Sequence, residues 1–128
     1  MFIRCCVFVV GLVTVEGCVG WTAPANRLDS LSSEEREVIL GLPILIEGDL
    51  SGKEHAVLDG VTGSSCQYTR SDPRATKTDA MNEAKYWAKQ QGADGIKNLK
   101  CDPPRERTIL NRCWERITCT GLAIKFAQ

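Results

Sequence analysis

The sequence lacks a surplus of charge of either sign. Its 128 residues include 16 lysines and arginines and 16 aspartates and glutamates, so the formal net charge is zero. Proteins that bind nucleic acid, and polybasic segments that bind anionic lipid, need an excess of Lys and Arg to neutralise phosphate groups. The charge balance therefore argues against nucleic acid as a partner and against a polybasic attachment to a membrane.

Catalytic and metal-binding motifs are also missing. The sequence contains a single histidine, His55, and no Cys-x-x-Cys pair. Structural zinc sites usually bring their ligands in such close pairs, and thiol–disulfide catalysts carry one at a helix N-terminus. Neither a Gly-x-Ser-x-Gly elbow nor a glycine-rich phosphate loop is present. We therefore expect a protein that is not an enzyme and that binds no metal or cofactor.

No apolar run is long enough to cross a membrane as a helix. The longest one, residues 5–15, would extend roughly 17 Å at 1.5 Å per residue, whereas the hydrocarbon core is about 30 Å thick. This run follows Arg4 near the N-terminus, an arrangement that is typical of the hydrophobic region of an export signal. We therefore expect residues 1–17 to be a signal peptide.

The apolar run ends at a candidate lipidation site. Val15-Glu16-Gly17-Cys18 resembles the bacterial lipobox, in which an aliphatic residue and two small residues precede the cysteine that is lipidated. Gly17 and Cys18 match this pattern, whereas Glu16 stands where a small uncharged residue is usual. We predict that Cys18 carries a lipid and becomes the new N-terminus. Val19 follows it, instead of the aspartate that usually marks retention in the inner membrane, so we expect an outer-membrane anchor.

The seven cysteines fit export to an oxidising compartment. Cys5 and Cys6 would leave with the signal peptide, and Cys18 would carry the lipid. An even number then remains, which makes two disulfides the expected state. The remaining four are Cys66, Cys101, Cys113 and Cys119.

Three pairings of these four cysteines are possible, and geometry excludes one. Cys113 and Cys119 lie on one predicted strand, so about 20 Å would separate them at ~3.3 Å per residue. A disulfide requires Cα atoms roughly 4.4–6.8 Å apart. Both of the other pairings would tie the last strand to the segments before and after the main helix, and the residues alone do not choose between them.

The pattern along the chain predicts an α+β domain of the order β-β-α-β-β, with one small sheet packed on one helix. We expect the lipid anchor and linker over 18–42, with a short helix over 34–40 capped by Ser32 or Ser33, and the globular domain over 43–128. Strands are predicted at 43–47, 56–61, 96–101 and 113–126. The helix between them should begin after Thr76 or Thr78 and end at Gly92.

Two details of this pattern concern packing. Alanines recur at helical spacing in the main helix, and small side chains let a helix lie close on a sheet, so we interpret that stripe as core. In the last strand, Ile117 and Cys119 point to one face, whereas Leu122, Ile124 and Phe126 point to the other. A β-bulge at Gly121 would bring both sets to one face.

Three stretches of the sequence carry a resemblance to a known family. They are GSSCQ at 63–67, QGADGIKNLKC at 91–101 and C-W-x4-C-x-G-x-A at 113–123. Together they resemble the globular domain of the RcsF family, the outer-membrane lipoprotein sensor of the Rcs envelope-stress phosphorelay. The similarity covers roughly residues 58–126.

The resemblance implies a disulfide pairing and a function. The first cysteine would pair with the third, Cys66 with Cys113, and the second with the fourth, Cys101 with Cys119. The family's sensor engages outer-membrane β-barrels and their assembly machinery. After envelope damage, its globular domain contacts the inner-membrane repressor of the phosphorelay. We therefore expect a lipid-anchored domain in the periplasm that signals by protein–protein contact.

One feature departs from the family. Its linker is long, proline-rich and basic, whereas residues 19–42 here contain one proline, Pro24. A structural or accessory envelope lipoprotein with the same fold and no signalling role is therefore the alternative.

Overall fold

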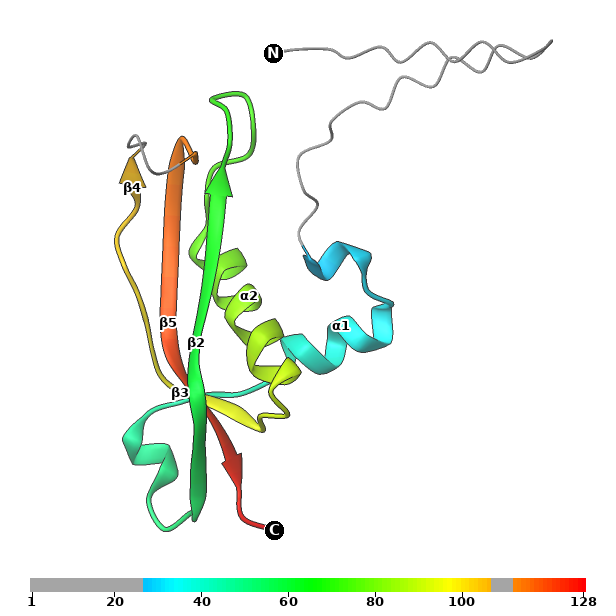
Figure 1. The fold of residues 1–128 in the computed structure, drawn as a ribbon, viewed down its shortest axis with the longest axis vertical. Helices are drawn as coiled ribbons and strands as arrows, with labels where there is room; N and C mark the ends of the chain where they lie inside the picture. The colour runs from blue at the N-terminus through cyan, green and yellow to red at the C-terminus, as the bar shows by residue number, and fades with distance from the viewer. Residues whose placement is uncertain (1–26, 107–111) are drawn as a thin grey trace, which may run out of the picture.

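In the computed structural model, which describes residues 27–106 and 112–128, helix α2 packs on one face of a mixed five-stranded sheet (Figure 1). The strand order is β1-β3-β5-β2, and β4 also pairs with β5. The expected α+β class, with two disulfides, is confirmed. The elements are the 3-10 helix η1 (Arg27–Ser30), α1 (Ser33–Leu40), β1 (Ile44–Leu45), the 3-10 helix η2 (Glu47–Leu50), β2 (His55–Gln67), α2 (Lys77–Gln90), β3 (Gly95–Cys101), β4 (Arg105–Glu106) and β5 (Glu115–Phe126).

Strand β2 is longer than the predicted strand at 56–61. The small residues from Gly63 to Cys66 are typical of a turn, and the prediction ended the strand before them. In the structure, pairing with β5 continues through all of them, as far as Gln67 opposite Glu115. Gly63 and Ser65 face α2, which lies directly on this part of the sheet, so their small side chains fit beneath the helix. The two-residue strand β4 was not predicted either.

The predicted bulge in the last strand is wrong, because the register shifts lie in its two neighbours. Strand β3 is shifted between Lys97 and Lys100, where Asn98 has a positive φ of 55°. Strand β2 is shifted between Val57 and Gly60. Strand β5 alternates without interruption, so its two apolar sets point to opposite faces of the sheet.

Each set of β5 side chains is covered by a different part of the chain. Ile117 and Ala123 belong to the buried clusters that include α2. On the other face Ile124 is fully buried. Helix η2 lies on that face, since the carboxylate of Glu47 is 3.7 Å from the ammonium of Lys97 on β3. The sheet therefore has a helix-covered face and a second face that η2 covers toward the C-terminal end of β5 (Figure 1).

Helix α2 begins and ends where the sequence predicts. Thr76 is the N-cap, and its hydroxyl accepts a hydrogen bond from the backbone N–H of Asp79. Gly92 follows the C-cap residue Gln91 with a φ of 76°, a left-handed conformation that glycine adopts without strain. Both ends of the helix are thus fixed by local sequence.

The small side chains of α2 allow a very close contact with the sheet. Ala80, Ala84 and Ala88 are fully buried. A Cβ placed on Gly63 of β2 would overlap the backbone of Ala80 and Ala84. Glycine at 63 is therefore required by the approach of the helix rather than by backbone conformation.

Residues 27–42, which we placed in the linker, pack against α2. Ser32 caps α1, with Glu35 completing the capping box, as the sequence predicts. Hydrogen bonds from the Ser32 hydroxyl and backbone N–H lower the pKa of the Glu35 carboxyl. On the α2 side, Leu28 and Ile39 are buried.

Two long side chains connect this N-terminal segment to α2. The Arg27 guanidinium lies 4.6 Å from the centre of the Trp87 ring. Lys85 donates a hydrogen bond of 2.7 Å to the carbonyl of Leu40, and partial burial lowers the pKa of its ammonium group. The described residues from Arg27 to Leu42 therefore belong to the packed domain.

We predict that Gly63→Ala destabilises the domain by at least about 2–3 kcal/mol, because the helix backbone must move to admit a methyl group. Gly60→Ala on the same strand is the matched control, since its Cβ would meet only the Gly121 carbonyl oxygen, at 3.9 Å. It should change stability by about 1 kcal/mol or less. Urea unfolding of the oxidised proteins measures both, and equal midpoints would contradict the close approach of α2.

Candidate functional site

The four expected cysteines form two disulfides in the structure. Cys66 is bonded to Cys113, and Cys101 to Cys119, which is the pairing that the resemblance implies. The bridges close loops with sequence separations of 47 and 18 residues. In this state none of the four cysteines offers the thiolate that a zinc site or a thiol–disulfide catalyst would use.

The Cys101–Cys119 bridge belongs to the core beneath α2. The two residues are direct partners in the β3–β5 ladder, and Cys119 is fully buried. They lie in one cluster with Ala80 of α2 and Ile117 of β5. This bridge therefore fastens the two central strands on the face that the helix covers.

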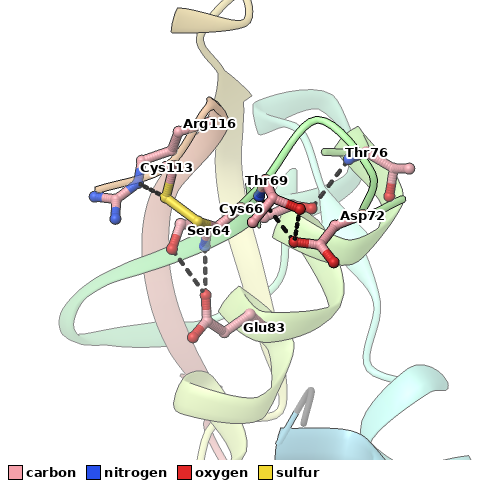
Figure 2. The surroundings of a disulfide bond; sticks show 9 residues. Ser64, Cys66, Thr69, Asp72, Thr76, Glu83, Cys113 and Arg116 are labelled. Carbon is pink, nitrogen blue, oxygen red and sulfur yellow. Dashed lines mark hydrogen bonds between the residues drawn. A yellow bond between two sulfur atoms is a disulfide. The ribbon is translucent and has the colours of Figure 1, made fainter. Parts of the chain in front are cut away.

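The Cys66–Cys113 bridge lies at the other end of β5. Cys66 is opposite Arg116 in the β2–β5 ladder, and alternation directs both away from α2. Cys113 has only 1% of its surface exposed. Figure 2 shows the Arg116 side chain beside this bridge, where its Nε–H donates a hydrogen bond of 3.2 Å to the sulfur of Cys113.

The loop from β2 to α2 is held beside this bridge by side-chain hydrogen bonds (Figure 2). The carboxylate of Asp72 accepts from both the backbone N–H and the hydroxyl of Thr69. The backbone N–H of Thr76 donates to the hydroxyl of Ser65. The buried side chain of Gln67 donates to the carbonyl of Asp72 at 2.9 Å. These bonds fix the loop relative to the end of β2.

A side chain from α2 also forms hydrogen bonds with the free edge of β2. The carboxylate of Glu83 accepts hydrogen bonds from the backbone N–H and the hydroxyl of Ser64 (Figure 2). A carboxylate in this place occupies a backbone donor that would otherwise be open to pairing with another chain.

Aromatic and arginine side chains surround the Cys66–Cys113 bridge. Trp114 is 36% exposed, and the guanidinium of Arg70 lies 4.4 Å from its ring centre. Tyr68 is 42% exposed. Arg74 pairs with Glu115 at 2.9 Å, and this hydrogen bond, with the attraction between the charges, raises the pKa of the Arg74 guanidinium. The end of the sheet near the bridge is therefore rich in exposed planar side chains.

The predicted lipidation site, Cys18, lies outside the described residues. Over residues 27–106 and 112–128, no helix has the length and apolar character needed to cross a membrane. Within the same ranges, no three His, Cys, Asp or Glu side chains gather as a metal site would require.

No family model and no curated protein sequence matches the chain.

Sequence reasoning found the four disulfide cysteines but missed the arginines and aromatics around one of the bridges. A signal was present, because Arg112, Trp114 and Arg116 all lie within three residues of Cys113 and Tyr68 lies two residues after Cys66. The contact between Arg70 and Trp114 joins two segments far apart in the chain. The Cys66–Cys113 bridge and the pairing of β2 with β5 bring these segments together.

We predict that each single cysteine substitution frees one particular partner. Cys66→Ser should leave Cys113 as the free thiol, and Cys101→Ser should leave Cys119. Loss of the bridges should cost about 4 and about 3 kcal/mol respectively in the chain-entropy model, from loops of 47 and 18 residues. A domain of this size has only about 5–15 kcal/mol in total, so loss of both should unfold it at growth temperature.

Alkylation of the free thiol followed by peptide mass spectrometry identifies the partner. Release of Cys119 by Cys66→Ser would contradict the pairing. Urea unfolding of the same variants measures the cost, with Ser71→Ala as a control for an exposed substitution in the neighbouring loop.

Proposed function

We propose that the protein is an envelope lipoprotein whose globular domain signals by contact with other proteins, as in the RcsF family that its sequence resembles. The observation that carries this proposal is the pairing of Cys66 with Cys113 and Cys101 with Cys119 in an α+β domain. The resemblance rests on sequence alone, and it implies the same pairing. The domain would lie in the periplasm, held to the outer membrane by a lipid on Cys18.

The distance from the anchor limits which partners the domain can reach. At most eight residues, 19–26, separate Cys18 from the segment that packs on α2, which includes Arg27. Fully extended, they reach at most about 32 Å, which is close to the thickness of a hydrocarbon core. A lipid-anchored domain of this kind stays near its membrane, so a partner must come to it there.

The short tether also supports the alternative, an accessory envelope lipoprotein without signalling. A sensor that reports to an inner-membrane repressor must either extend across the periplasm or meet a partner that does. This chain would depend on the second arrangement, in which the partner's own domain reaches the outer membrane.

We predict that Cys18 carries the lipid. Cells expressing the full chain and given an alkyne fatty acid should incorporate the label, because Gly17-Cys18 ends an apolar run of signal-peptide length. Cys18→Ala should lose the label, whereas Cys6→Ala, within the signal, should keep it. Equal labelling of wild type and Cys18→Ala would refute lipidation at this residue.

The signalling role predicts a response that depends on the protein. In the native host, deletion of the gene should abolish induction of an envelope-stress reporter after outer-membrane damage, and the full chain supplied in trans should restore it. A flexible insert after residue 22, which lengthens the tether, distinguishes the signalling role from the accessory role further. If the length of the tether limits contact with the partner, the longer chain should induce the reporter more strongly. Unchanged induction in the deletion strain would favour the accessory role.

A further inference from the structure

We propose that the surface around the Cys66–Cys113 bridge is a docking site for an acidic segment of a partner protein. This surface, the arginine–aromatic cluster, consists of Tyr68, Arg70, Trp114 and Arg116, together with the exposed Arg112, which precedes Cys113 in the sequence. The inference rests on the proposed function, because that function requires a contact surface and leaves it undefined.

The first support is that the arginines of the cluster lack carboxylate partners, unlike the other arginines that the structure describes. Arg27, Arg36, Arg74 and Arg105 each lie within 4 Å of an Asp or Glu. Among residues 27–106 and 112–128, no such ion pair joins Arg70, Arg112 or Arg116 to a carboxylate. Among the described residues, the three arginines without a carboxylate partner thus belong to the two segments that flank the Cys66–Cys113 bridge.

Three carboxylates near the cluster are engaged with other groups, whereas Glu106 on β4, opposite Glu115, is in none of the ion pairs of the described residues. Asp72 accepts from Thr69, and Glu115 accepts from Arg74. Asp102 lies 3.5 Å from Arg105. The positive charge of the cluster is therefore not balanced by these neighbours, although the chain as a whole is neutral. An acidic segment would supply the missing partners.

Two of the three guanidinium groups are held in place before any partner binds. Arg70 is stacked on the ring of Trp114. Arg116 donates its Nε–H to the sulfur of Cys113, which leaves its two terminal nitrogens for a second acceptor. A planar guanidinium binds a carboxylate through two parallel hydrogen bonds, and pre-orientation lowers the entropy lost on binding.

The composition of the cluster favours a protein over a phosphate polymer or a lipid surface. Tyr, Trp and Arg are the residues most enriched at the energetic centres of protein interfaces. Trp114 and Tyr68 expose 36% and 42% of their surfaces on backbone that the bridge and the β2–β5 ladder fix. A neutral chain lacks the long-range field that attracts polyanions. We therefore commit to an acidic protein segment that also offers apolar contact.

The test is photo-crosslinking in the native host from the full-length, membrane-anchored chain. A benzophenone amino acid replaces Tyr68, whose side chain is exposed, or Val38 on α1 as the control position, which is 51% exposed. The probe at 68 should capture one protein, and the probe at 38 should not. Mass spectrometry of the adduct should place the crosslink within a few residues of Asp or Glu in the partner.

Charge variants decide whether the arginines carry the contact. Arg70→Glu with Arg112→Glu should reduce the adduct from position 68 at least about tenfold, the loss expected for charge-assisted hydrogen bonds at an interface. Arg27→Glu with Arg36→Glu makes the same change at arginines paired elsewhere and should leave the adduct intact. Replacing the acids of the captured segment with Lys should restore the adduct to the Arg70→Glu, Arg112→Glu chain.

Several outcomes would overturn the proposal. In the crosslinking experiment, they are equal adducts from the probes at positions 68 and 38, an adduct with lipid or polysaccharide only, and no adduct from position 68. In the charge-variant experiment, the contradicting outcome is an adduct that the Arg70→Glu, Arg112→Glu change leaves intact. Retention of both disulfides in the variants, checked by mass, separates loss of contact from misfolding. The stress reporter is scored separately, so an acidic partner at position 68 with no reporter response would support the docking site and refute signalling.

Discussion

The contact between α2 and β2 at Gly63 is the constraint on which the rest of the fold depends. Because the helix backbone touches the strand backbone there, glycine is required on the sheet side, and the buried side chains of the helix are all alanines. The close contact keeps β2 against the helix although β2 is an edge strand of the sheet. It also places Glu83 of α2 beside that edge, where it accepts from Ser64.

The same contact explains which elements could be predicted from sequence. Helix α2, its caps and its alanine stripe follow from local spacing, and the long strand β5 follows from its apolar alternation. The end of β2 could not be predicted, because Gly63 and Ser65 indicate a turn until the helix above them is known. We expected an irregularity in β5, whereas the register shifts lie in β2 and β3. The apolar pattern of β5 shows that its side chains point to both faces of the sheet, but it does not show that both faces are covered.

The N-terminal segment shows a second limit of local reasoning. The capping box of Ser32 and Glu35 identifies α1, yet nothing in its sequence says whether the helix packs or stands free. Its buried residues are few, and the contacts that hold it come from Arg27 on Trp87 and from Lys85 on the Leu40 carbonyl. Such contacts join residues tens of positions apart, so only the assembled fold shows that residues 27–42 belong to the packed domain.

The two disulfides lie on opposite faces of the sheet, and this division would suit a small domain that binds a partner in the way we propose. The side chain of Cys119 points toward α2, and its bridge adds buried apolar volume to a core to which the helix contributes mainly alanines. Cys113, six residues earlier, is joined to Cys66, whose side chain turns away from α2, and this bridge fixes the end of the sheet where Trp114 and Arg116 are exposed. A loop that presents large side chains to water loses conformational entropy when it binds a partner, and a cross-link at its base removes part of that loss in advance. In the proposed docking site, the Cys66–Cys113 bridge would therefore contribute to stability and to binding affinity together, whereas the Cys101–Cys119 bridge would contribute to stability alone.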